Sequence, residues 1–284
     1  MSFDPSLPEN GINVSRTHPL REAAVLVGGL LAIVAAIAVA AALLVDVLVP
    51  RLPVGLEQRL FAFTAHDRPD EGEPDAPAAR AVQELLDRLA GHWPDNPYAL
   101  RVVLWQQKAP NALAFPGGWV VVTTGLLEQA TSENELAFVL GHELGHFRGR
   151  DHLRGLGRGL ALGLVVAAVG GSGASGAAQL TELAGRFAGR RFDRDQESDA
   201  DRFGLALVAS EYGHVGGSAD FFARLAAQPD SEDGALAHYL STHPLHAERV
   251  AELQRVAERE GWRTRGSLTP FLDPAPQEGK PNAS

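Results

Sequence analysis

The chain has no cysteine among its 284 residues. This absence excludes disulfide bonds, zinc–thiolate sites, cysteine-ligated iron–sulfur clusters and cysteine catalysis. Basic residues are also scarce, since 25 Lys and Arg stand against 35 Asp and Glu, which gives a formal net charge of −10. Nucleic-acid binding needs clustered Lys and Arg that face phosphates. We therefore expect no nucleic-acid partner.

One long stretch lacks charge altogether. Residues 23–45 contain neither a charged residue nor a proline. As a helix they would extend about 34 Å, enough to cross the hydrocarbon core of a bilayer. We predict a transmembrane signal anchor over residues 22–49. A cleaved signal peptide is the alternative, but the apolar run is longer than the roughly 7–15 residues usual in such peptides.

The charges beside this span predict its orientation. Arg16 and Arg21 precede it, whereas Asp46 follows it. Positive charge is retained on the cytoplasmic side of membrane helices. We therefore expect a single-pass membrane protein whose main domain is extracytoplasmic, on the periplasmic side, with a cytoplasmic domain as the alternative.

The remaining sequence divides by composition. A short polar tail, a linker, one large domain and a disordered tail are expected at residues 1–21, 50–78, 79–270 and 271–284. Apolar residues at helical spacing predict helices at about 79–91, 132–148, 192–212, 218–227 and 246–259. Ser132 and Glu135 form the pattern of a capping box at the start of the second helix. Strand-like runs occur at 100–105 and 111–124, the second interrupted by Pro-Gly-Gly.

The most specific motif is His-Glu-Leu-Gly-His at residues 142–146. Two histidines four residues apart lie one turn above each other on the same face of a helix, so both imidazoles can bind one metal ion. Glu143, one position round, can then reach a water on that ion. This is the H-E-x-x-H helix of zinc metallopeptidases.

A catalytic zinc site needs a third protein ligand, and His152 is one candidate. Residues 142–152 match the metzincin pattern H-E-x-x-H-x-x-G-x-x-H. Metzincins also need a methionine turn beneath the metal, but Met1 is the only methionine in the chain. No clear helix stop follows Gly149 either, because an apolar pattern continues beyond it.

Glu197 is the other candidate for the third ligand. It lies in a predicted helix with Asp201 one turn further on, on the same face. Two histidines and one glutamate are a known ligand set of catalytic zinc. Asp201 could accept the free ring N–H of a ligating histidine and fix its orientation.

Four motifs together resemble the HtpX-like and CAAX-prenyl-protease-type gluzincins, a family of membrane-associated zinc metallopeptidases. In chain order they are Asn111-Ala-Leu-Ala-Phe-Pro-Gly-Gly118, the zinc-helix motif, Glu197-x-x-x-Asp201 and His243-Pro-x-x-x-x-Arg249. The resemblance covers about residues 80–260. It implies an α+β fold, predominantly α: a zincin-like metallopeptidase domain preceded by one transmembrane helix. A small β-sheet would line the cleft with its edge strand.

The resemblance also implies a site and an activity. One zinc ion per chain would be held by His142, His146 and Glu197, and Glu143 would act as general base. Asp201 and Arg249 would support the ligands, and His243 would either stabilise the oxyanion or cap the zinc in a resting state. An extended substrate would pair with the edge strand at Ala112, Leu113, Ala114 and Phe115.

The implied function is a zinc-dependent metalloendopeptidase that acts on polypeptides, misfolded or membrane-proximal, at the lipid bilayer. Two alternatives remain open: a zinc-stabilised binding or chaperone-like module without catalysis, and a metzincin-type protease with His152 as third ligand. The oligomeric state is not predicted.

A second apolar stretch, residues 159–180, also has to be placed. One membrane span there would put His142 and Glu197 on opposite sides of the bilayer, where they could not share a metal. Two spans would need about 40 apolar residues. We therefore expect a helix that packs in the domain or rests on the membrane surface.

Overall fold

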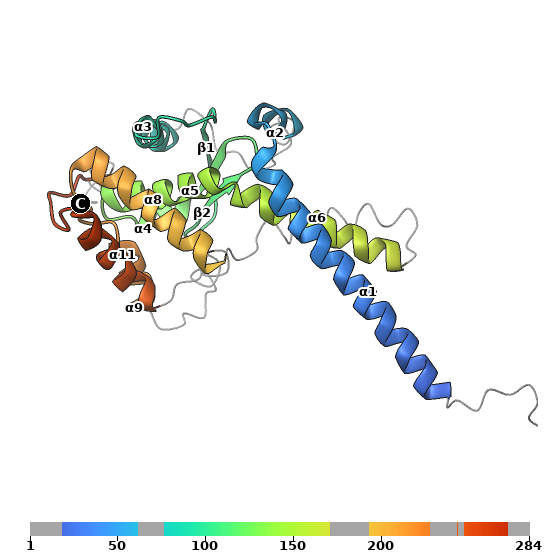
Figure 1. The fold of residues 1–284 in the computed structure, drawn as a ribbon. Helices are drawn as coiled ribbons and strands as arrows, with labels where there is room; N and C mark the ends of the chain where they lie inside the picture. Colours follow the sequence, from blue (N-terminus) through green and yellow to red (C-terminus); the bar gives the residue numbers. More distant parts are fainter. Residues whose placement is uncertain (1–18, 62–76, 171–192, 228–242, 244–246, 272–284) are drawn as a thin grey trace, which may run out of the picture.

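The computed structural model describes residues 19–61, 77–170, 193–227, 243 and 247–271. Within them, a mostly helical domain with one small β-sheet lies at one end of a long amino-terminal helix (Figure 1). The prediction of an α+β fold that is predominantly α is confirmed.

The amino-terminal helix α1, Pro19–Leu48, extends away from the domain, and none of its residues is buried. Its most apolar stretch of 18 residues has a mean hydropathy of 2.8, and among the described helices α1, continued by the short turn η1 (Val49–Arg51), is the one long and apolar enough to cross a membrane. The chain then turns, because Pro50 and Pro53 lack the N–H that a continuing helix needs. Helix α2 (Val54–Leu60) follows, inside the segment predicted as a linker.

Three helices form the core of the domain: α3 (Pro77–Gly91), α5 (Glu133–Gly149) and α8 (Arg194–Tyr212). Helix α5 lies at the centre, and every residue from 134 to 147 is buried. The Ser132 side chain caps it by accepting the N–H of Glu135 at 3.3 Å. The Glu135 carboxylate accepts from Thr131 instead of from Ser132, so only half of the predicted capping box is present.

The sheet contains β1 (Arg101–Trp105), β2 (Ala112–Phe115) and β3 (Trp119–Thr123) in the order β1-β3-β2. Strand β3 is parallel to β1 and antiparallel to β2. The turn from β2 to β3 places Gly117 and Gly118 at φ of 92° and 93°, a region that favours glycine. The predicted substrate-binding segment is therefore an edge strand of the sheet.

The remaining helices are α4 (Thr124–Gln129), α6 (Asp151–Gly170), α9 (Asp220–Ala227) and α11 (Ala247–Glu260). The apolar pattern beyond Gly149 does not continue helix α5, whose end agrees with the helix predicted to about residue 148. Helix α5 ends there because Arg150 adopts a left-handed conformation with φ 56°, and α6 begins at the next residue.

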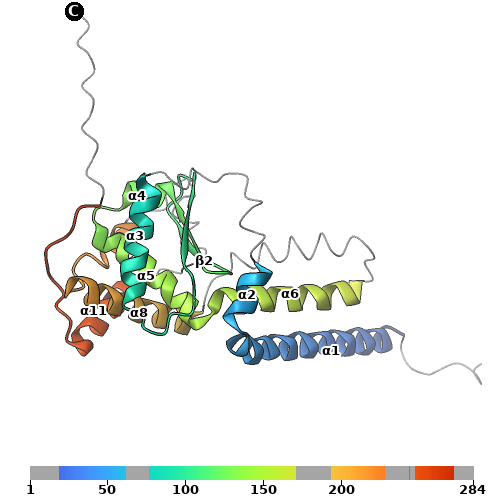
Figure 2. The same cartoon turned by 90° about the horizontal axis from the view of Figure 1, so that it is seen from above.

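Helix α6 runs alongside α1 and away from the domain (Figure 2). Arg158 binds both carboxylate oxygens of Asp46 at 2.7 and 2.8 Å. A Cβ on Gly157 would lie 2.8 Å from the Val45 side chain, which shows how closely the two helices approach. The described part of the second apolar stretch, residues 159–170, therefore packs along α1 and not in the domain; residues 171–180 lie outside the described residues.

Candidate metal centre

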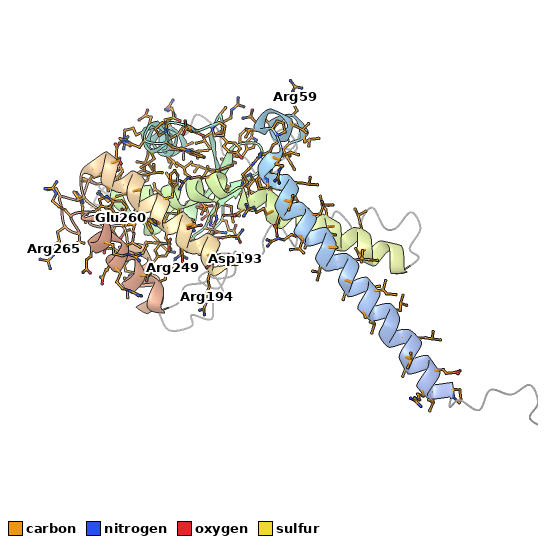
Figure 3. All side chains as sticks on the ribbon, in the orientation of Figure 1. Arg59, Asp193, Arg194, Arg249, Glu260 and Arg265 are labelled. Atoms are coloured by element: carbon orange, nitrogen blue, oxygen red, sulfur yellow. The ribbon has the colours of Figure 1, made fainter. Side chains whose placement is uncertain are left out.

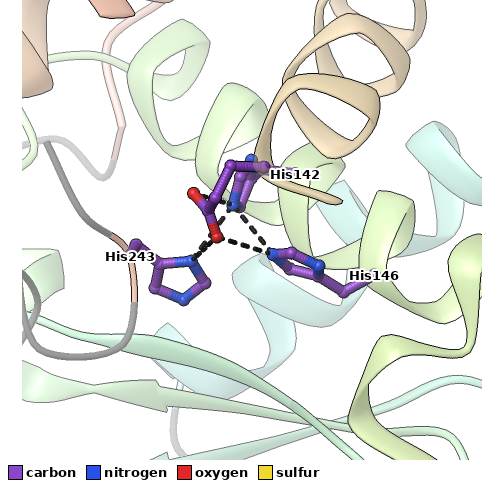
Figure 4. Close-up of side chains that lie close together, drawn as sticks. His142, His146 and His243 are labelled. Carbon is purple, nitrogen blue, oxygen red and sulfur yellow. Dashed lines mark hydrogen bonds and ion pairs between the residues drawn. The ribbon is translucent and has the colours of Figure 1, made fainter. Parts of the chain in front are cut away.

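Three predicted ligands meet at the contact between α5 and α8. The Nε2 atoms of His142 and His146 are 3.1 Å apart. Glu197, from α8, places its two carboxylate oxygens 3.6 Å from His142 Nε2 and 3.5 Å from His146 Nε2. All three side chains are buried. Figure 4 shows the imidazole rings converging on one point.

The other ring nitrogens face carboxylates. His142 Nδ1 lies 2.9 Å from Asp201, and His146 Nδ1 lies 3.0 Å from Asp151. A carboxylate can only accept, so each ring carries its proton on Nδ1 and turns the lone pair of Nε2 inward. Asp201 is the partner expected for a ligating histidine, whereas Asp151 was missed, because its approach depends on the helix break at Arg150.

This donor set fits a metal ion. Two donors on a tetrahedral ion at about 2.0–2.1 Å lie about 3.3–3.4 Å from each other, close to the separations between Glu197 and the two Nε2 atoms. Two inward lone pairs and a carboxylate would repel one another unless a cation lay between them. Although burial lowers the pKa of His146, Asp151 and Glu197 raise it to about 9, so without a metal a proton would occupy the Nε2 position that a metal cation takes when bound.

Arg249, which is labelled in Figure 3, lies on α11 and contacts Asp201 and Glu197. Its Nε and Nη2 atoms donate to the two oxygens of Asp201 at 2.7 Å each, and its Nη1 lies 2.7 Å from Glu197 Oε2. Burial by itself would raise the pKa of Asp201, but Arg249 and His142 outweigh it and lower the pKa. Burial also opposes ionisation of Glu197, yet His243, His142 and His146 lower its pKa as well. Both acids are therefore ionised at neutral pH.

Glu143 lies beside the three donors and faces the sheet. Its Oε2 accepts the backbone N–H of Ala114 at 2.7 Å, and its Oε1 lies 3.5 Å from His243 Nε2. The N–H of Ala114 donates to Glu143 and therefore points away from β3. Backbone groups alternate in direction along an antiparallel strand, so those of Ala112 and Ala114 both face the free edge. Leu113 and Phe115, paired with Val121 and Trp119, face β3.

His243 comes closest of the remaining predicted residues to the cluster. Its Nδ1 is 3.2 Å from His142 Nε2 and 3.1 Å from Glu197 Oε1. His142, His146, Glu197 and His243 each offer one donor atom, and these four atoms all lie within 4.8 Å of one another. The geometry therefore offers His243 as a fourth donor.

His152 lies elsewhere. Its Nε2 is 3.0 Å from Glu57 Oε1, and it is not among the four residues that share the donor cluster. The left-handed turn at Arg150 starts a new helix, so the metzincin spacing in the sequence does not bring His152 to the two other histidines.

Comparison with known proteins agrees with this geometry. The chain is 31% identical to a putative beta-barrel assembly-enhancing protease of Vibrio cholerae over 188 residues, 63% of this chain and 39% of the relative. It is 31% identical to the mitochondrial metalloendopeptidase OMA1 of Danio rerio over 202 residues, and 30% identical to that of Homo sapiens over 192 residues. These alignments cover 63% and 62% of this chain, and 41% and 36% of the relatives.

The chain therefore spans only about two fifths of the length of these relatives. Residues 75–257 match the profile of peptidase family M48, and this segment contains the four donor residues, Glu143 and the edge strand. From this match over more than half of its length, we conclude that the chain belongs to peptidase family M48.

Proposed function

We propose that this protein is a membrane-anchored zinc metalloendopeptidase. The observation that carries the proposal is the convergence of His142, His146 and Glu197 beside Glu143, whose carboxylate is bound to the edge strand through Ala114. A purely structural metal site has no use for a buried carboxylate at this place. The catalytic domain would occupy residues 79–270.

The donor chemistry favours one zinc ion per chain. Two imidazoles and a carboxylate without any thiolate form a ligand set used by catalytic zinc. When bound, zinc supplies Lewis-acid chemistry that makes water nucleophilic near neutral pH. Asp201 and Asp151 would orient the two histidines, and Arg249 would orient Glu197.

The protein groups would divide the proton transfers and the binding between them. Glu143 takes a proton from the attacking water and passes it to the amine that leaves, so that a carboxylic acid and an amine replace the peptide bond. An extended substrate adds a strand to the free edge of β2, where Ala112 and Ala114 present their backbone groups. Substrate binding and proton transfer would therefore share the contact between Glu143 and Ala114.

His243 is best placed to cap the site in a resting state. Four protein donors are typical of structural zinc sites, whereas catalysis needs one open position. We infer that His243 leaves the cluster during turnover. Stabilisation of the oxyanion is the second role proposed for it.

The membrane placement rests on α1 and α6. We propose that α1 crosses the bilayer once, with the domain on the extracytoplasmic side and the bilayer around Leu160 and Leu164, which are exposed on α6. A complete crossing of the bilayer by the stretch at residues 159–180 would place His142 and Glu197 on opposite sides of the membrane. A partial insertion therefore keeps both halves of the metal centre on one side. Misfolded or membrane-proximal polypeptides are the proposed substrates.

The test is cleavage of unfolded casein by the full chain in detergent. We expect zinc-dependent cleavage that a chelator stops and added zinc restores. Glu143→Gln should retain zinc and lose activity, whereas the control Glu84→Gln, an exposed glutamate on α3, should retain both. A zinc-loaded protein that cleaves nothing, with Glu143→Gln behaving identically, would instead support the binding module.

Two further measurements test the third ligand and the orientation in the membrane. Zinc content should fall in Glu197→Ala and not in His152→Ala; the reverse result would support the metzincin-type site. Protease treatment of sealed vesicles, with cleavage near Trp119 as the readout, distinguishes an extracytoplasmic from a cytoplasmic domain.

A further inference from the structure

A second buried cluster of ionisable side chains lies outside the metal centre, around Glu57 of α2. The Glu57 side chain is 0% exposed, and each carboxylate oxygen has two partners. Oε1 accepts the N–H of Gly117 at 2.9 Å and lies 3.0 Å from His152 Nε2. Oε2 accepts from the Tyr98 hydroxyl at 3.1 Å and from Arg150 Nη2 at 2.9 Å. On the outer side of α2, Arg59 points away from the domain (Figure 3).

These partners keep Glu57 ionised. Burial by itself would raise its pKa, but His152, the Gly117 N–H and Arg150 lower it to about 2. A buried carboxylate is costly unless it is paired and hydrogen-bonded, and four donors satisfy both oxygens here. The cluster therefore requires a negatively charged side chain at residue 57. Packing alone would be satisfied by an uncharged side chain of the same shape.

Two partners of Glu57 lie at the ends of the two elements that flank the metal centre, helix α5 and strand β2. Arg150 ends α5, four residues after His146, and Gly117 lies in the β2–β3 turn, three residues after Ala114. Helix α5 carries two metal donors and Glu143, and β2 carries the free edge. One carboxylate thus bridges the end of the zinc helix and the end of the edge strand.

The same cluster also contacts the segment that follows α1. The Arg150 guanidinium donates to the carbonyl oxygen of Val49 at 3.0 Å and to that of Leu52. Helix α2 itself begins only a few residues after α1 ends. The position of the edge strand relative to α5 is therefore tied to the chain where it leaves α1.

We propose that Glu57 is a positioning residue of the peptidase: it holds the β2–β3 turn against the end of α5 and so aligns the edge strand with Glu143. This inference rests on the proposed function, because alignment of an edge strand matters only for an extended substrate. A role in general stability alone would not distinguish long substrates from short ones.

The Glu57→Gln variant tests the proposal with almost no change in shape. The amide keeps one accepting oxygen and places an NH₂ group where two donors already point. The β2–β3 turn should loosen, while His142, His146 and Glu197, which Glu57 does not touch, should still bind zinc. Extended peptides that pair with β2 should therefore bind less well than in the wild type, and blocked dipeptides should be affected little.

The experiment uses the full, zinc-loaded chain in detergent, with Glu84→Gln as the matched control. For Glu57→Gln we expect KM for a long peptide to rise about tenfold, equivalent to about 1.4 kcal/mol, with kcat, zinc content and dipeptide cleavage near wild-type values. Amide hydrogen exchange should accelerate in residues 112–119 and not in α5 or α8. Glu84→Gln should change none of these quantities.

Three results would overturn the proposal: unchanged KM and exchange, an equal loss on long and short substrates, or loss of zinc with faster exchange throughout the domain. If Glu57→Gln does not fold, Tyr98→Phe is the second variant, because it removes one donor and keeps the charge pairs. It should give a smaller rise in KM and a smaller acceleration of exchange in residues 112–119. If Tyr98→Phe changes neither, the proposal is contradicted. A wild-type protein that cleaves nothing would refute the proposed function instead, and the exchange measurement would still decide whether Glu57 holds the turn.

Discussion

Gly204 offers a sharp test of how the metal centre is assembled. It lies where α8 crosses α5, and a Cβ there would lie 2.8 Å from the His142 nitrogen and 3.1 Å from the Gly141 carbonyl carbon. Both contacts are with backbone, which cannot turn aside. In Gly204→Ala, α8 must move away from α5 by about half an ångström to restore ordinary contact distances.

Two opposing effects set the size of the change. Alanine gains about 1 kcal/mol over glycine in a helix, whereas overpacking costs about 1–3 kcal/mol. We therefore expect metal-free Gly204→Ala to lose up to about 2 kcal/mol of unfolding free energy. Glu197 and Asp201 move with α8, and metal sites tolerate changes of only about 0.2 Å in ligand distance. Zinc affinity should fall about 10–100-fold.

The assay combines urea unfolding of the chelated protein in detergent with zinc competition against a chromophoric chelator. Gly91→Ala is the control, because no atom lies within 4 Å of a Cβ at this position, and it should leave zinc affinity unchanged. If Gly204→Ala binds zinc as tightly as the wild type and unfolds at a higher urea concentration, close approach of α8 to α5 does not assemble the site.

Three other changes make separate predictions. His243→Ala should raise kcat for a peptide substrate, because its Nδ1 lies among the metal donors; a fall of about 10²–10³ in kcat would instead support oxyanion stabilisation. Asp151→Asn should weaken zinc binding about 10–100-fold by reducing the basicity of His146, measured by the same competition, with exposed Asp95→Asn as an unaffected control. Glu57 should stabilise the fold above about pH 4.5, and this contribution should disappear as the pH falls toward 2, because its pKa is lowered from 4.5 to about 2 in the folded state. The full contribution is about 3 kcal/mol, so the unfolding free energies of metal-free wild type and Glu57→Gln should converge over this range; a constant difference would contradict the assigned ionisation.

Local periodicity was readable from the sequence. The helical spacing of Val82, Leu85, Leu86 and Leu89 predicted the buried face of α3, and all four are buried. The positions of β1 and β3 followed from runs rich in valine, and that of β2 from the Pro-Gly-Gly turn that separates it from β3. These features depend on residues a few positions apart, whose relative placement is set by the geometry of a helix or a strand.

The contacts around Arg150 were not readable in this way. A left-handed residue is usually glycine or asparagine, so nothing in the sequence indicated that Arg150 would adopt this conformation and start a new helix. The turn there separates His146 from His152. It places Asp151 beside His146 and His152 beside Glu57, and it directs α6 along α1. The positions of His152 and of α6 depend on partners from α2 and α1, which are far away in the sequence.

The residues of the metal centre therefore have two origins. The pairing of His142 with His146 was determined by the sequence alone, since an α-helix aligns residues four apart whatever surrounds it. Which distant acids and histidine join them was decided by tertiary structure, because only the close crossing of α5 and α8 brings Glu197 within 3.6 Å of both imidazoles. Tertiary structure also determines the environment of Glu57, because four donors from separate parts of the chain stabilise its buried negative charge.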